Sequence, residues 1–180
     1  TVIWLNWGVR PDRLNLSPTV QFKGKRTPDG VGYAERSPQD HGLAVVPGQW
    51  GAQVIDELPL APQDVLVFKH RLSGFWDNEL DSILRQQGIT TLLFAGVNTD
   101  RCVFSSLQDA GFLGYDCVLL SDACSTPSPA YVTKAVHFTT ERLVFPFLSF
   151  KQAKAENRVI SNAQTTFTIN PGPGSRRCIS

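Results

Sequence analysis

The segment ITTLLFAGVNTDRCVFSSLQDA, from Ile89 to Ala110, decides how this chain is expected to fold. Its first part, Thr91 to Val97, is a nearly uninterrupted apolar run, which is typical of a strand covered on both faces of a sheet. A helix is expected to follow, with Thr99 as its N-cap residue and Cys102 in its first turn. The segment therefore predicts a cysteine at the start of a helix, directly after a buried strand.

The start of a helix is a favourable place for a reactive cysteine. The first backbone N–H groups have no partner within the helix, and the positive end of the helix dipole lies there. These features favour a thiolate and can hold a developing oxyanion. A free cysteine by itself is more often an inert packing residue. The surrounding strand, turn and helix favour the interpretation of Cys102 as a nucleophile.

Strands and helices alternate along the rest of the chain, which predicts an α/β fold with a Rossmann-like parallel sheet in three layers and helices on both faces. Residues 7–49 form a long irregular segment with weak periodicity. The carboxyl ends of parallel strands form the ligand crevice, where Trp7, Lys69 and Cys102 are expected to converge. The expected strands are Val2–Leu5, Asp64–Phe68, Thr91–Val97, Asp116–Leu120 and one near Leu143–Phe150, and the other expected helices are Trp50–Leu58, Asn78–Gln87 and Pro129–Phe138.

Composition narrows the possible functions. With 180 residues and a formal net charge of +1, the chain fits one domain and has no basic block for nucleic acid or an anionic membrane. No apolar run is long enough to span a bilayer. We expect a small-molecule substrate, no metal or other cofactor, and a reducing, cytoplasmic location. The cysteines show neither zinc spacing nor a disulfide framework; they are Cys102, Cys117, Cys124 and Cys178.

Two segments together carry a family resemblance: VFKHRLSGFWDNELD, which begins at Val67, and FAGVNTDRCV, which begins at Phe94. They resemble the isochorismatase-like cysteine hydrolases, a superfamily that includes nicotinamidases and N-carbamoylsarcosine amidohydrolases. The likeness extends over roughly Val2 to Ala155. We therefore expect a hydrolase domain over residues 1–155 and a flexible or atypical tail over residues 156–180.

The resemblance implies a site and a reaction. The family cleaves small amide or carbamoyl C–N bonds with a catalytic Asp, Lys and Cys, and its members commonly form homo-oligomers. It uses a cis peptide bond before the cysteine helix to aim N–H groups at the oxyanion. By position, the resemblance implies Cys102 as nucleophile, Lys69 as the triad lysine, a cis bond between Val97 and Asn98, the N–H groups of Asn98 and Cys102 as oxyanion hole, and Trp7, Phe75 and Trp76 as pocket walls.

Some of these residues also have plain structural interpretations. Lys69 alone would be read as a solvated lysine at a strand end, and Trp7 and Trp76 could belong to the core. Arg10 could pair with Asp12 or bind a substrate carboxylate. The segment after the first strand lacks the Asp-x-His pattern with which nicotinamidases bind a metal, so no metal site is expected.

One element of the family pattern has no counterpart. The catalytic Asp of the family ends a first strand of the V-I-D-x-Q type, which lies in the middle of its sheet, and this chain has no such segment. The hypothesis is an N-terminally shortened form. Thr166–Ile169 alternates like a strand and could fill the gap, but Asn162–Ile169 contains no carboxylate. The alternative function is therefore a non-catalytic binding or interaction protein. A flavodoxin-like nucleotide binder is disfavoured because no glycine-rich phosphate loop follows a strand.

Overall fold

The computed structural model describes residues 1–25, 30–143, 147–148 and 165–169. Parallel strands alternate with helices over most of the chain, as expected, which makes this a mixed α/β fold of the Rossmann-like class. The strands are β1 (Val2–Trp7), β2 (Val65–Lys69), β3 (Thr91–Val97), β4 (Asp116–Ser125), β5 (Phe147–Leu148) and β6 (Thr165–Ile169), and the α-helices are α1 (Pro18–Gly24), α2 (Leu80–Gln86), α3 (Phe104–Phe112) and α4 (Ala130–Leu143).

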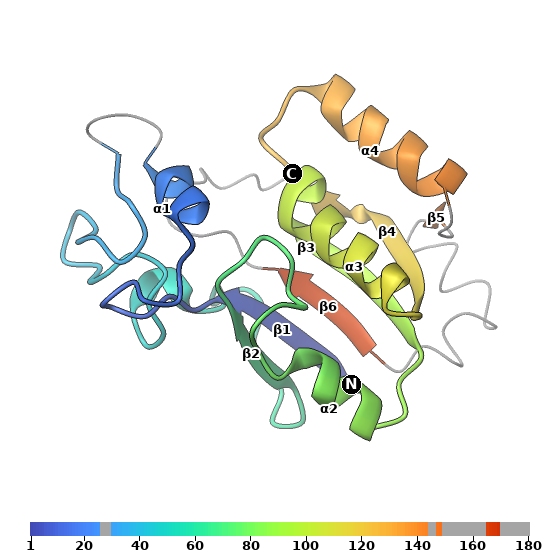
Figure 1. The fold of residues 1–180 in the computed structure, drawn as a ribbon, viewed down its shortest axis with the longest axis horizontal. Coiled ribbons are helices and arrows are strands. Elements are labelled where there is room, and N and C mark those ends of the chain that lie inside the picture. Colours follow the sequence, from blue (N-terminus) through green and yellow to red (C-terminus); the bar gives the residue numbers. More distant parts are fainter. Residues whose placement is uncertain (26–29, 144–146, 149–164, 170–180) are drawn as a thin grey trace.

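A single sheet of six strands runs in the order β2-β1-β6-β3-β4-β5, and every neighbouring pair is parallel (Figure 1). All carboxyl ends therefore lie at one edge of the sheet. Trp7 pairs with Lys69 at the ends of β1 and β2, so these two side chains leave neighbouring strands at the same level. This pairing places both residues at the edge where the ligand crevice of a parallel sheet opens.

The last described strand in the sequence lies in the middle of the sheet. Ile169 of β6 pairs with Leu5 of β1 on one side and with Gly96 of β3 on the other. The position between β1 and β3, where the family resemblance leaves a missing strand, is thus occupied by a segment from the tail (Figure 1). Residues 156–164 and 170–180 of that tail lie outside the described residues.

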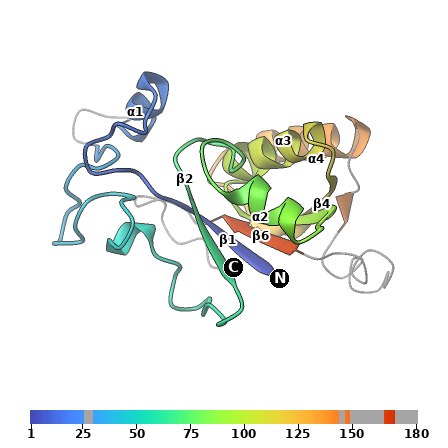
Figure 2. The same ribbon diagram turned by 60° about the horizontal axis from the view of Figure 1, so that its bottom comes forward.

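The main core lies between the sheet and helices α2 and α3, which Figure 2 shows on the same side of the sheet. Leu5 and Phe94 from the strands pack there with Leu84 and Leu107 from the helices. Alternate residues of β3 and β4 point to the other face, where Leu93, Val118 and Leu120 form a smaller cluster. Because apolar clusters lie on both faces of the sheet, the apolar runs of β3 and β4 are continuous.

Helix α2 ends at Gln86, one residue before the expected end at Gln87. Gly88 has a φ of +65°, and its N–H donates to Arg85 O while the N–H of Ile89 donates to Leu84 O. This is the Schellman arrangement, in which a glycine takes the left-handed conformation. No helix in the described part of the chain is long and apolar enough to cross a bilayer.

Several predicted boundaries are wrong. The expected helix over Trp50–Leu58 is only a 3-10 turn at Trp50–Ala52, because Ile55 and Leu58 are exposed and offer no apolar face to pack. The segment 7–49 contains the unpredicted helix α1, where Pro18 follows Ser17 at the first helical position. Strand β4 extends to Ser125 and α4 to Leu143, beyond the expected ends. Of the expected last strand, only Phe147–Leu148 is described as a strand, and 144–146 and 149–150 lie outside the described residues.

Candidate active site

The charged side chain of Lys69 is fully buried, with 0% of the residue exposed. Its Nζ lies 3.6 Å from the centre of the Trp7 ring and donates a hydrogen bond of 2.7 Å to Arg71 O. Trp7 is itself 5% exposed, so the ammonium group is covered by an aromatic face and held by a carbonyl. A lysine buried in this way has a fixed position, which distinguishes it from a solvated lysine at a strand end.

Cys102 lies in a wide turn between β3 and α3. Thr99–Val103 forms one π-helical turn, in which the N–H of Val103 donates to Asn98 O, and the N–H of Arg101 donates to the same oxygen. The thiol is 5% exposed, and its Sγ lies 3.5 Å from Lys69 Nζ. The sheet therefore brings together three residues that the sequence predicts to converge, Trp7, Lys69 and Cys102.

The predicted helix start at Cys102 needs one correction. Thr99 is not the N-cap residue; Asn98 precedes the turn in extended conformation and makes no side-chain cap. Thr99 Oγ1 is buried without a partner among the described residues, because Thr99 is already inside the wider turn. The peptide bond between Val97 and Asn98 is cis. Asn98 therefore directly precedes the short turn, and Cys102 lies within it.

Phe75 and Trp76 lie along the far part of α3. The Phe75 ring packs against Tyr115, with 5.9 Å between ring centres, and Tyr115 precedes β4 at the amino edge of the sheet. Trp76 is 57% exposed, and its indole N–H donates to Asp109. Asp109 lies about two helical turns after Cys102. The Phe75 and Trp76 side chains thus contact Tyr115 and Asp109, whereas Trp7 covers the Lys69 ammonium group.

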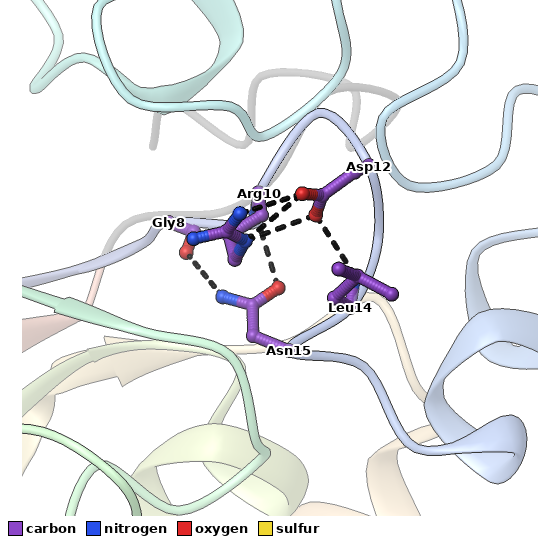
Figure 3. Close-up of polar contacts among 5 residues, drawn as sticks. All are labelled: Gly8, Arg10, Asp12, Leu14 and Asn15. Atoms are coloured by element: carbon purple, nitrogen blue, oxygen red, sulfur yellow. Dashed lines mark hydrogen bonds and ion pairs between the residues drawn. The ribbon is translucent and has the colours of Figure 1, made fainter.

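Arg10 is held by its own loop, as Figure 3 shows. Its guanidinium donates to both carboxylate oxygens of Asp12, with the closest approach 2.6 Å, and Asp12 also accepts from the N–H of Leu14. Asn15 joins the same loop to Gly8 O and to the N–H of Arg10. The hydrogen bonds from Arg10 and Leu14 lower the pKa of Asp12 to about 2. Of the two alternatives for Arg10, the structure shows the pair with Asp12, and this pair is exposed; binding of a substrate carboxylate by Arg10 stays a prediction.

Asp100 is the carboxylate nearest to Cys102 in the sequence, and it faces the loop between β4 and α4. It accepts hydrogen bonds from Thr126 Oγ1 and Ser128 Oγ and pairs with Arg101 at 3.6 Å. Burial raises its pKa, but the hydrogen bonds from the two hydroxyl groups together lower it by more, so the pKa of Asp100 lies below its usual value. Asp100 thus fastens the cysteine turn to the neighbouring loop.

The loop after β2 carries a second ionic contact. Asp77 lies 2.9 Å from the Arg71 guanidinium and 3.7 Å from His70 Nε2. Burial and the charge of Arg71 lower the pKa of His70, although Asp77 opposes this. Arg71 also donates to Asn15 O at 2.7 Å, which connects this loop to the one after β1.

Two buried residues of the site were not singled out from the sequence. Ser106 Oγ lies between Cys102 O and the N–H of Gly74, and none of its atoms is exposed. The sequence gives only their positions. Ser106 follows Cys102 by one helical turn, and Gly74 follows Ser73 in the segment that begins at Val67. A single sequence cannot show that these two positions meet.

The family model for the isochorismatase domain matches residues 20–146. The chain belongs to the isochorismatase family. Its fold is similar to that of an isochorismatase family protein from Desulfovibrio vulgaris subsp. vulgaris str. Hildenborough, with 24% identity, 89% of this chain and 75% of that chain covered, and a TM-score of 0.70.

Two further solved structures have a similar fold. One is a cysteine hydrolase from Pseudomonas syringae pv. phaseolicola 1448A, with 23% identity, 90% of this chain and 73% of that chain covered, and a TM-score of 0.71. The other is N-carbamoylsarcosine amidase from Thermoplasma acidophilum, with 24% identity, 82% and 70% covered, and a TM-score of 0.60. At these identities the likeness shows the fold, and the expected family membership is confirmed by the family model.

Proposed function

We propose that this isochorismatase family member is a cysteine hydrolase that cleaves the C–N bond of a small amide or carbamoyl compound. The observation that carries the proposal is the 3.5 Å contact between Lys69 Nζ and Cys102 Sγ at the carboxyl edge of the sheet. An ammonium group at this distance stabilises negative charge on sulfur, which is the charge of an attacking thiolate. Trp7 holds that ammonium in place.

The proposed reaction has two steps. Cys102 Sγ attacks the carbonyl carbon, the C–N bond breaks, and the thiol proton goes to the leaving nitrogen. Water then attacks the thioester, its hydroxyl stays on the acyl carbon, and its other proton returns to the sulfur. The N–H groups of Asn98 and Cys102 are the proposed donors to the oxyanion. The N–H groups of Arg101 and Val103 both point to Asn98 O, which orients the turn that carries these donors.

The solved structures support the choice of substrate class. One of the similar folds is an N-carbamoylsarcosine amidase, and another is a cysteine hydrolase. A homo-oligomer acting on a small molecule is proposed on the family resemblance. Light scattering of the purified chain measures its mass directly, and a monomeric mass would contradict the oligomer.

A non-catalytic binding protein is the second candidate, and one observation favours it. The strand in the position of the family's Asp strand is β6, and its residues, Thr165 to Ile169, include no carboxylate. In this alternative the pocket retains the family's shape, and small amides bind without turnover.

Hydrolysis of a panel of small amides and carbamoyl compounds, followed by ammonia release, tests the proposal. The Cys102→Ala variant should show no turnover above background. Cys117→Ala should keep its turnover, because Cys117 is buried inside strand β4 and takes no part in the proposed reaction. Iodoacetamide labelling at neutral pH, read by peptide mass, should be fastest at Cys102. Labelling at Cys102 no faster than at Cys178 would contradict an activated thiol, and stabilisation by panel compounds without turnover would favour the binding protein.

A further inference from the structure

One buried hydroxyl connects the two segments that carry the proposed catalytic pair. Ser106 lies on α3, one turn after Cys102, and is 0% exposed. Its Oγ donates to Cys102 O at 2.7 Å and accepts from the N–H of Gly74 at 2.9 Å. The proposed reaction uses no atom of Ser106, so these contacts need another explanation.

Gly74 is the other end of this connection. It closes the short loop that follows Lys69, and Lys69 Nζ itself donates to Arg71 O inside that loop. A Cβ on Gly74 would overlap Leu5 Cδ2, so the loop backbone lies directly against β1. Asn78 donates to Gly74 O at 2.9 Å, which fixes the same residue from the other side. The loop is therefore packed in one position, and Ser106 is its contact with α3.

We propose that Ser106 is a positioning residue that sets the separation of Lys69 and Cys102, an inference that rests on the proposed function. Its hydroxyl joins the loop after Lys69 to the carbonyl of the nucleophile residue itself. Lys69 and Cys102 come from opposite sides of β6, so no direct strand pairing fixes their distance. A displacement of about 1 Å between reacting groups can cost a hundredfold in rate.

The hydroxyl is required on chemical grounds. Serine supplies one hydrogen to Cys102 O and a lone pair to the N–H of Gly74, and threonine supplies both as well. Alanine and valine supply neither, and they leave the buried N–H of Gly74 without an acceptor. Valine and threonine have the same shape, so their comparison isolates the hydroxyl from any effect of volume in this packed site.

The experiment compares Ser106→Thr with Ser106→Val in the full chain. The rate of iodoacetamide labelling at Cys102 is measured from pH 5 to 10, and kcat and KM are measured on the best substrate of the panel. We expect labelling at neutral pH and kcat to fall about tenfold or more in the valine variant relative to the threonine variant, with KM changed less. The pH of half-maximal labelling should rise in the valine variant only. Ser105→Ala, at the neighbouring partly exposed hydroxyl, is the matched control and should behave as wild type.

Hydrogen exchange at the Gly74 amide keeps the test decisive if both variants are destabilised. Protection of this amide in wild type and the threonine variant, with loss in the valine variant, supports the bridge. Equal labelling, kcat and exchange in the threonine and valine variants would overturn the inference. Slow labelling of Cys102 in the wild-type chain is a different outcome, because it contradicts the proposed function before any variant is made.

Discussion

Cys102 and Cys117 are both buried thiols of the same fold, yet they have different surroundings. Cys117 is 1% exposed inside β4, where burial first and the charge of Asp116 second raise its pKa to about 12. Cys102 is 5% exposed in the turn after β3, with an ammonium group 3.5 Å from its sulfur. Under the proposed function, the ammonium group buried beside Cys102 is what distinguishes this thiol from the equally buried thiol of Cys117.

Cys124, near the carboxyl edge of the sheet, can be compared with Cys102 in the same way. It pairs with Gly96 across the β3–β4 ladder, close in the sheet to the cysteine turn. Burial raises its pKa to about 12, a backbone hydrogen bond at Gly96 opposes this rise, and the charge of Asp122 adds a smaller increase. The difference between Cys102 and the two β4 cysteines can be measured as the ratio of their labelling rates. The variants below test this difference and the contacts around it.

The largest effect is expected from Phe167→Pro in β6. A strand with partners on both sides cannot lose an N–H without losing a ladder hydrogen bond, and the carbonyl left without its donor costs about 1 to 3 kcal/mol. The sheet should then open between β1 and β3, and Cys117 should label as fast as Cys102. Thermal unfolding and peptide-resolved labelling measure both effects. Phe167→Val keeps the N–H and is the control; thermal unfolding of the proline variant at the wild-type temperature would contradict the central role of β6.

Lys69→Met should have the next largest effect on the comparison. The methionine side chain keeps an apolar stem of similar length but removes the ammonium beside Cys102 Sγ. We expect labelling of Cys102 at neutral pH to slow by about tenfold or more, with Cys117 unchanged. Lys134→Met, at an exposed lysine of α4, is the matched control. Unchanged labelling of Cys102 in the Lys69 variant would show that the lysine does not act on the thiol.

Asp100→Asn should have a moderate effect on stability. An amide can accept only at its oxygen, so one of the hydrogen bonds from Thr126 and Ser128 is lost, at about 1 to 2 kcal/mol in the free energy of unfolding. Asp109→Asn, on α3 and bonded to the exposed Trp76, is the control and should cost less.

The pH dependence of the Asp100 effect has a definite sign. Because the folded-state pKa of Asp100 lies below its unfolded value, the carboxylate stabilises the fold above the unfolded pKa. This contribution is lost as the pH falls through the folded pKa. Urea unfolding between pH 7 and pH 3 should therefore show the difference between wild type and Asp100→Asn shrinking as acid is added. A constant difference would contradict the assignment.

The smallest effect is expected at Arg10. Its guanidinium is 60% exposed and paired with Asp12, so Arg10→Gln should change the labelling rate of Cys102 less than twofold. A substrate carboxylate that replaces Asp12 as its partner would instead appear as a raised KM with kcat unchanged. Steady-state kinetics on acidic and neutral amides separates these two results.

The sequence predicted the parts of the site that depend on neighbours along the chain. The strand before Cys102 has such a local pattern, and so do β1 and β2, although β1 extends to Trp7 and β2 to Lys69, beyond the expected ends at Leu5 and Phe68. The turn at Thr99–Val103 was expected as an ordinary helix start, because a π-helical turn has no distinct residue pattern.

Contacts between distant segments were not predictable. The Ser106 bridge depends on how α3 meets the loop after β2, and the bond between Trp76 and Asp109 turns an expected pocket residue toward the surface. Thr166–Ile169 has the alternation of a strand, but only the three-dimensional pairing with β1 and β3 shows where it lies. Tertiary packing decides these positions, and local propensity carries no information about them.

The place of β6 has a consequence for how the protein is made. Val2 of the first strand pairs with Thr166, and roughly 70 residues separate the end of β3 from β6, so a ribosome needs several seconds between them. During that time β1 and β3 are both synthesised, but the strand that joins them does not yet exist. Their open edges are then templates for pairing with other chains. Yield of folded protein should therefore respond to translation speed and chaperone supply more than its modest length suggests.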